Sequence, residues 1–98
     1  MGKELYFILV VYDISNNKRR TKLHNTLLNY GTAVQYSVFE CLLDQVGIKE
    51  MKRDTMRIVN IKKDNVRFYS ICKSCLEKIE VIGGREMLLE PPDAMIVG

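Results

Sequence analysis

The stretch from Glu4 to Ile14, ELYFILVVYDI, sets the frame of the predicted fold. It is almost uniformly apolar and rich in β-branched and aromatic residues, which is typical of a strand buried on both faces of a sheet. Its apolar run, Leu5 to Tyr12, is far shorter than the roughly 20 residues of a membrane-spanning helix. The run ends at Asp13 and lacks a small-residue cleavage site, so it does not have the pattern of a signal peptide. We predict a central strand here and no membrane partner.

A helix is predicted directly after this strand. Residues 15–17, Ser-Asn-Asn, offer side chains that cap helix N-termini. Apolar residues then recur at the spacing of a helix face, as Leu23, Leu27 and Tyr30. Gly31 is a natural residue to end such a helix.

The remaining chain continues to mix strands and helices. Alternating polarity predicts a single strand over residues 33–43, with Phe39 on its more polar side. The other predicted elements are a helix at 46–59, a turn at 62–65, and strands at 66–72, 76–82 and, after two prolines, 94–97.

In this order the elements predict one α+β domain over residues 1–98, a ferredoxin-like sandwich of βαββαβ type with an extra C-terminal strand. Two helices would cover one face of its antiparallel sheet, so the other face would meet solvent or a partner. We expect Phe39 to face outward and to make such a contact. The short core and the detached apolar tail also favour a homodimer.

Composition narrows the class of protein further. A hydrophobic content of 47% with 28% charged residues is ordinary for a globular domain and argues against disorder. The net charge of +3 is a weak indication of an acidic partner. Three cysteines is an odd count, and reduced thiols in a cytoplasmic protein are the simpler interpretation.

Asp13 is the strongest candidate for chemistry. A carboxylate at the end of a buried strand lies at the rim of the sheet, and its oxygens suit Mg²⁺ or Mn²⁺. The alternative is that Asp13 only ends the strand or bonds to the following turn. One carboxylate per chain supplies few ligands for a catalytic metal ion. A two-fold axis close to Asp13 would bring a second carboxylate from a partner chain.

A basic segment begins the first predicted helix, with Lys18, Arg19, Arg20 and Lys22. Cations are unfavourable at this end of a helix, so the arrangement is easier to explain if a polyanion binds there. A solvated charged face is the alternative. A second basic stripe on residues 49–57 contains acids as well and is interpreted as solvated.

The cysteines and the histidine give weaker signals. Cys72 and Cys75 form a CxxC pair, but with only Cys41 and His24 elsewhere a zinc site within one chain is incomplete. A strand is predicted to follow the pair closely, which favours local packing over a redox role. His24 is interpreted as a packing or surface residue.

In combination, four pieces of the sequence resemble one known family. They are the string YDIS at 12–15, the basic helix with Arg20, Gly31, and the string QYSVFE at 35–40. The pattern resembles the small CRISPR-associated protein that partners the spacer-acquisition integrase, and the resemblance covers nearly the whole chain. This chain departs from the family at two positions. Ala33 stands where many relatives have a basic residue, and Lys22 stands where they often have Arg, which favours the binding role over the cutting role.

The resemblance implies a ferredoxin-like homodimer whose tail, 91–98, pairs with the partner chain. It implies a metal-dependent endoribonuclease or double-stranded DNA endonuclease, in which Asp13 and its symmetry mate hold Mg²⁺. It also implies a scaffold that joins integrase subunits and binds a duplex through basic residues. Under this interpretation Tyr12, Ser37 and Phe39 shape the dimer cleft.

Two alternatives remain at this point. A toxin-type ribonuclease has the same fold, and a ferredoxin-like regulatory module would lack nuclease activity. The basic helix start and the paired YDIS and SVFE strings argue against the regulatory module.

Overall fold

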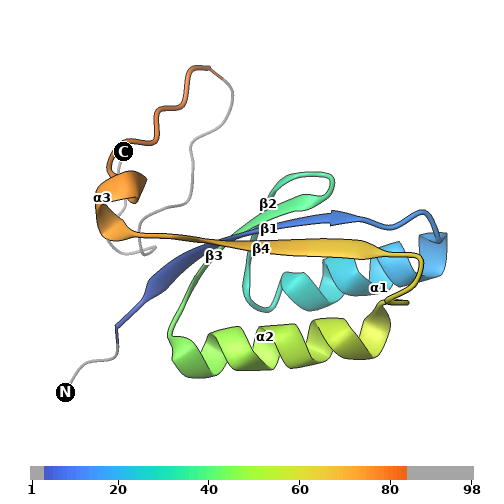
Figure 1. Cartoon of the computed structure of the whole chain (residues 1–98). Coiled ribbons are helices and arrows are strands. Elements are labelled where there is room, and N and C mark those ends of the chain that lie inside the picture. Colours follow the sequence, from blue (N-terminus) through green and yellow to red (C-terminus); the bar gives the residue numbers. More distant parts are fainter. Residues whose placement is uncertain (1–3, 84–98) are drawn as a thin grey trace.

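The first strand, β1 (Tyr6–Asp13), lies inside a four-stranded sheet, with a neighbour on each side. The computed structural model describes residues 4–83. It has the elements β1, α1 (Asn17–Leu27), β2 (Gly31–Gln35), β3 (Val38–Leu43), α2 (Gln45–Ile58), β4 (Asn65–Ile71) and α3 (Lys73–Leu76) (Figure 1).

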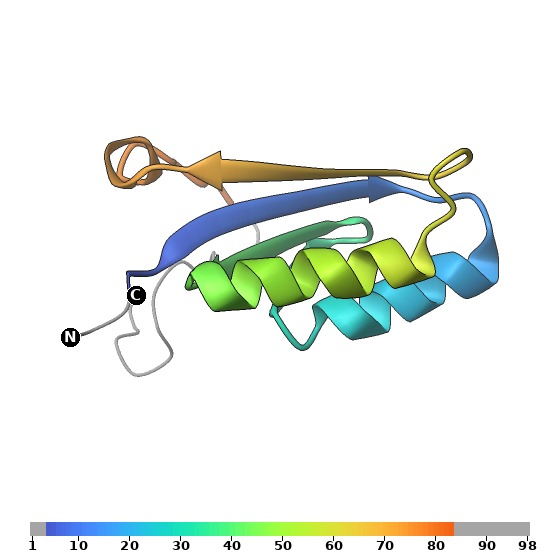
Figure 2. The ribbon, with the colours of Figure 1, turned by 60° about the horizontal axis from the view of Figure 1, so that its bottom comes forward.

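The strand order is β2-β3-β1-β4, and every neighbouring pair is antiparallel. The helices α1 and α2 lie side by side on one face of the sheet, as Figure 2 shows from a second direction. This arrangement confirms the predicted ferredoxin-like βαββαβ sandwich. The predicted tail strand at 94–97, within the segment 91–98, lies outside the described residues. No helix within residues 4–83 is long and apolar enough to span a membrane.

The core lies between the sheet and the two helices. Alternate residues of β1, namely Ile8, Val10 and Tyr12, point toward the helices and are almost fully buried. Leu23 of α1 and Met51 of α2 complete the same cluster and are fully buried. The alternation of β1 therefore sets a covered face of the sheet and an open face.

Local sequence explains where the two long helices begin. The Asn16 side chain accepts a hydrogen bond of 2.9 Å from the Arg19 N–H, as predicted for this N-cap. The Asp44 side chain accepts a hydrogen bond of 2.7 Å from the Gly47 N–H and caps the N-terminus of α2.

The prediction of one strand over 33–43 is wrong. Tyr36 and Ser37 form a turn, and the segment is a hairpin of β2 and β3. Its register shifts between Ala33 and Gln35, which is the signature of a bulge.

The prediction that Phe39 faces outward is also wrong. Phe39 is fully buried and belongs to the core cluster. On β3 the odd-numbered residues Phe39 and Cys41 point toward the helices, so the core takes the side that was interpreted as polar.

Two further expectations are corrected. The segment 76–82 is not a strand, because the chain after β4 turns into α3 and its backbone N–H groups bond to carbonyls three or four residues earlier. Gly31 does not end α1 but begins β2. A Cβ at Gly31 would lie 2.3 Å from the Glu40 carbonyl oxygen and 2.5 Å from the Cys41 Sγ, so the close approach of the two strands requires glycine there.

Candidate metal and nucleic-acid-binding site

Asp13 is the last residue of β1 and lies at the rim of the sheet, as predicted. Its neighbour in register is Asn65, the first residue of β4. Asp13 is exposed, and its carboxylate makes no hydrogen bond or ion pair with another residue between 4 and 83. It therefore does not serve to cap the following turn, and its oxygens face solvent.

The donor chemistry of Asp13 fits a hard divalent cation. Mg²⁺ commonly takes one or two carboxylates and completes its shell with water and substrate phosphate. No cluster of three or more metal-binding side chains occurs within the described part of the chain. No second acid of the described residues joins Asp13 in such a cluster, so a second carboxylate for the metal would have to come from another chain.

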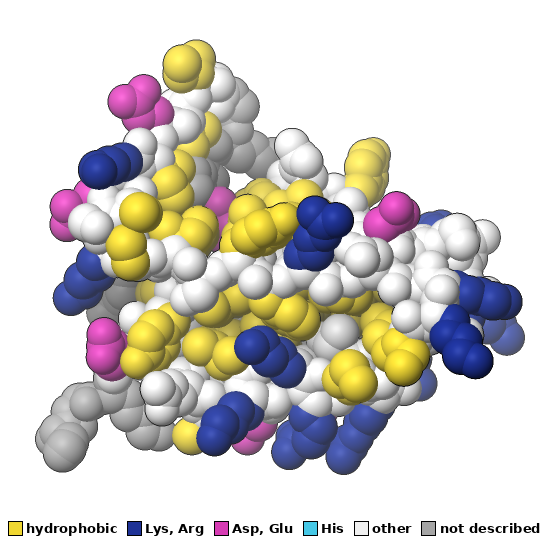
Figure 3. All heavy atoms as spheres, in the orientation of Figure 1, with side chains coloured by type: hydrophobic (Ala, Val, Ile, Leu, Met, Phe, Trp, Pro, Cys, Tyr) yellow, Lys and Arg dark blue, Asp and Glu magenta, His cyan; other side chains and the backbone are white. Residues whose placement is uncertain are grey.

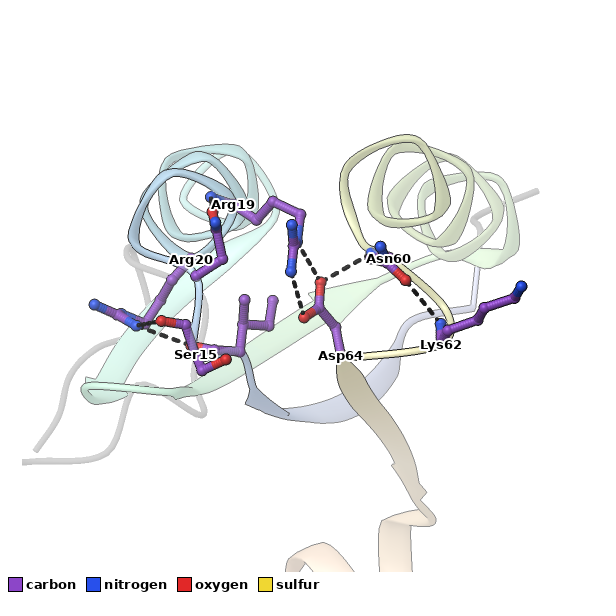
Figure 4. A network of polar contacts seen from close by, with 8 residues as sticks. Ser15, Arg19, Arg20, Asn60, Lys62 and Asp64 are labelled. Carbon is purple, nitrogen blue, oxygen red and sulfur yellow. Dashed lines mark hydrogen bonds and ion pairs between the residues drawn. The ribbon is translucent and has the colours of Figure 1, made fainter.

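Arg20 holds the loop that follows Asp13. Its guanidinium donates hydrogen bonds to the carbonyl oxygens of Ile14, at 2.9 Å, and Ser15, at 3.2 Å (Figure 4). It also donates to the Asn17 side chain. Three acceptors around one guanidinium fix the backbone directly after β1, so Arg20 keeps the rim near Asp13 in place.

Arg19 is paired within the molecule. Its Nε and Nη2 donate to the two carboxylate oxygens of Asp64 at 2.7 and 3.1 Å. Asp64 has no exposed side-chain surface and also accepts a 2.8 Å hydrogen bond from the Asn60 N–H. The Arg19 hydrogen bonds, and then that of Asn60, lower the pKa of the Asp64 carboxyl below its usual value. The pair docks the turn between α2 and β4 against the start of α1, as Figure 4 shows.

Exposed lysines lie on both of the segments that this contact joins, although the Lys62 side chain points away from α1 (Figure 4). We define the basic rim as Lys18 and Lys22 of α1 together with Lys62 and Lys63 of the turn before β4, all of them exposed. Figure 3 shows Lys and Arg side chains over α2 and at the end of the molecule where α1 begins. The sequence alone pointed to Lys18 and Lys22, whereas Lys62 and Lys63 were interpreted only as part of a turn.

The four predicted nucleic-acid-binding residues therefore divide into two groups. Arg19 and Arg20 are half-buried and engaged with acceptors of the same chain. Lys18 and Lys22 are exposed and make no ion pair with another described residue. The arginines shape the surface, and the lysines are the cations that it presents to solvent.

Tyr12 joins the end of β1 to the β2–β3 turn. Its O–H donates to the Tyr36 carbonyl at 3.1 Å and lies 3.5 Å from His24 Nδ1. Its N–H donates to the Ser37 carbonyl at 3.1 Å. Burial raises the pKa of Tyr12, and the nearby charge of Arg20 offsets part of that rise. Tyr12 thus anchors the turn and, through the backbone, the position of Asp13.

Of the three residues predicted to shape a dimer cleft, two are in the core. The rings of Tyr12 and Phe39 stack with centroids 6.3 Å apart, and neither residue exposes more than 3% of its surface. His24 packs edge-on against Phe39 with ring centroids 5.2 Å apart, in agreement with its interpretation as a packing residue. Ser37 is half-buried in the turn.

A family model described as "CRISPR associated protein Cas2" matches residues 6–79. Among curated proteins, the chain is 41% identical over 83 residues to "CRISPR-associated endonuclease Cas2 2" of Thermus thermophilus, covering 85% of this chain and 86% of the relative. It is 34% identical over 93 residues to "CRISPR-associated endoribonuclease Cas2 3" of Synechocystis sp., covering 95% of this chain and all of the relative.

A solved structure is likewise similar to this chain. A chain of a partial Cas6-RT-Cas1–Cas2 complex superposes on this structure with a TM-score of 0.73 at 29% sequence identity. The superposition covers 94% of this chain and 98% of that chain.

Proposed function

Because the chain belongs to the Cas2 family of CRISPR-associated proteins, we propose that it is a nucleic-acid-binding homodimer of CRISPR spacer acquisition with metal-dependent endonuclease activity. The relatives are named as an endonuclease and an endoribonuclease, so double-stranded DNA and RNA are both candidate substrates. The match favours this function over a toxin-type ribonuclease or a regulatory module. Nucleic acids as substrates agree with the expected cytoplasmic location.

One observation carries the proposal: an exposed carboxylate without a partner in residues 4–83 lies at the rim of the sheet, close to the start of the basic helix. Asp13 ends β1, and four residues later α1 begins. The basic rim would hold the phosphate backbone, while Asp13 would lie beside it with free oxygens. An acid without a structural role next to phosphate-binding cations is what a metal-dependent nuclease requires.

A dimer would complete this site. A metal bridged by two Asp13 side chains needs a two-fold axis near the rim. The open face of the sheet supports such an axis, because Leu9 and Val11 are only half-buried there and Tyr69 of β4 is 45% exposed. A contiguous apolar patch on a sheet face is a common site of association between chains.

The free edge of β4 supports a role for the tail. In the sheet, β4 pairs only with β1 among the described strands, so its other edge presents unpaired backbone groups. A strand from a second copy would pair with this edge. We propose that the apolar tail at 94–97 of the partner takes that place, as the family resemblance implies.

In this proposal each group of residues has a separate role. The lysines of the basic rim bind phosphates, Arg20 and Tyr12 fix the end of β1, and the two Asp13 carboxylates supply the metal ligands. When bound, Mg²⁺ or Mn²⁺ would polarise the scissile phosphate and lower the pKa of a water molecule that attacks it. The same dimer would serve as the scaffold that contacts the integrase subunit, in keeping with the complex that contains the structural relative.

The decisive experiment replaces Asp13 with Asn and measures cleavage of RNA and double-stranded DNA with Mg²⁺ or Mn²⁺. Asp13→Asn keeps the shape of the side chain and removes its charge. Cleavage should be lost, whereas duplex binding should remain, since the phosphate contacts come from the lysines. Glu50→Gln, at an exposed acid of α2, is the matched control and should cut like the unchanged protein.

Equal cleavage by the Asn variant would assign the activity to other residues or to a contaminant. If no metal supports cleavage by either protein, the nuclease part of the proposal fails and the scaffold part stands alone.

A further inference from the structure

A pair of cysteines lies at the other end of β4 from the candidate metal site. β4 ends at Ile71, Cys72 is the N-cap residue of α3, and Cys75 lies within that helix. Both cysteines are exposed. The Leu76 N–H donates to the Cys72 carbonyl at 2.8 Å, so the chain from Cys72 to Cys75 is wound as one helical turn.

The turn brings the two thiols together. Cys72 Sγ lies 3.3 Å from Ser74 Oγ. The Cα atoms of residues three apart in a helical turn are about 5 Å from each other. That separation falls within the roughly 4.4–6.8 Å spanned by disulfides. A bond between the two sulfurs would therefore need little movement of the backbone.

The two thiols differ in reactivity. Hydrogen bonds from Ser74, and then from Cys75, lower the pKa of Cys72 to about 7. The hydrogen bond to Cys72, and then the charge of that thiolate, raise the pKa of Cys75. The third cysteine, Cys41, is buried against Met51, and burial raises its pKa to about 11. One thiol of the three is thus activated, and a second lies within reach of it.

We propose that Cys72 and Cys75 form a redox-active dithiol that exchanges with small-molecule disulfides and closes to a disulfide within the chain. The Cys72 thiolate attacks one sulfur of the oxidant, forms a mixed disulfide and releases one thiolate. The Cys75 thiol then loses its proton and attacks the Cys72 sulfur, which releases the second half of the oxidant as a thiolate. The protein loses two electrons and two protons, and one oxidant disulfide becomes two thiols.

The strand that was expected directly after the pair had argued against this role. The structure removes that objection, because α3 follows β4 and the first cysteine precedes the helix while the second lies in it. The reducing cytoplasm would keep the pair as thiols at rest, so the disulfide would form only under oxidative conditions.

The test exposes the full-length reduced protein to glutathione disulfide and follows the product by mass spectrometry. The expected product has lost two hydrogens and carries no glutathione. Trypsin cleaves after Lys73, so the new bond should link the peptides FYSICK (68–73) and SCLEK (74–78). In addition, iodoacetamide at neutral pH should modify Cys72 about tenfold or more faster than Cys75.

Two variants separate the steps. Cys75→Ser should stop the reaction at a stable glutathione adduct on Cys72, and Cys72→Ser should give no closed product. Both residues are exposed, so neither change should prevent folding, which circular dichroism can verify. Independent glutathione adducts on both cysteines of the unchanged protein, bonds only between chains, or no reaction would each overturn the proposal. None of these results bears on cleavage by Asp13.

Discussion

The two faces of the sheet differ in how deeply their side chains are buried. On the covered face, Ile8, Val10 and Tyr12 of β1 expose at most 3% of their surfaces. On the other face of the same strand, Phe7 is buried at one end, but Leu9 and Val11 remain half-buried and Tyr69 on the neighbouring strand is 45% exposed. One strand therefore contributes to the core on one side and, on the other, to the apolar surface at which we propose that a partner chain binds. Substitutions on the two faces should consequently be measured by different experiments.

The largest effect is expected on the covered face. Phe39→Ala should lower the free energy of unfolding by about 3–5 kcal/mol, because it leaves a cavity among Tyr12, His24 and the helices. Urea denaturation measures the change. Tyr36→Ala, which removes an aromatic ring with 98% exposure at the nearby turn, is the control and should change stability by no more than about 0.5 kcal/mol. Similar losses for both variants would mean that Phe39 is not a core residue.

On the open face, the effect should appear in association and not in folding. Tyr69→Glu should raise the dimer dissociation constant by about tenfold or more, since a charge would be buried in the interface. Sedimentation velocity measures this constant. Met56→Glu introduces the same charge on α2, at a side chain with 63% exposure, and should leave the dimer intact. A dimer unaffected by Tyr69→Glu would place the interface elsewhere.

A smaller effect is expected at the basic rim. Replacing Lys62 and Lys63 with Ala should make the dependence of log affinity for duplex DNA on log salt shallower, by about 0.9 for each phosphate that the protein no longer neutralises. All sequences should be weakened alike. The control replaces Lys49 and Arg57, two exposed cations of α2, and should preserve the slope. The opposite result would move the binding surface from the rim to α2.

The last prediction concerns the link that secures the helices over the covered face. The pKa of Asp64 is lower in the folded protein than in the unfolded chain, so its ionised form stabilises the fold. That contribution is complete above the ordinary aspartate pKa of about 4 and is lost as the pH falls through the folded value. Asp64→Asn should therefore destabilise the protein at neutral pH, and the difference from the unchanged protein, measured by urea denaturation, should shrink in acid. A difference that is independent of pH would argue against the ion pair with Arg19.

Prediction from the sequence succeeded where the pattern was local. The apolar run of β1, the N-cap before α1 and the helical spacing of α2 are each decided by neighbouring residues, and these elements are confirmed. The β2–β3 turn was missed because no glycine, proline or asparagine marks it, and the single serine, Ser37, is a weaker turn signal. The alternating polarity then continued unbroken through the hairpin and placed Phe39 on the wrong face.

The candidate site was foreseen only in part, for a similar reason. Asp13 could be placed at the rim because the end of an apolar strand is visible in the sequence. The partner of Arg19 lies 45 positions away, so no local signal joins Arg19 to Asp64. The same contact holds the turn that carries Lys62 and Lys63 against the start of α1, and it emerges only from the packing of the two helices.

During synthesis, β1 emerges before the other described strands, and its pairing with β4 has to await the synthesis of β4. Phe7 pairs with Ile71 and Asp13 with Asn65, so one edge of β1 stays open until the nascent chain has passed β4. At translation rates of about 5–20 residues per second, this wait lasts roughly 3 to 12 seconds. An apolar strand with an open edge can pair with other chains in that time. The order of the strands thus exposes the nascent chain to aggregation at β1, the strand that lies inside the finished sheet.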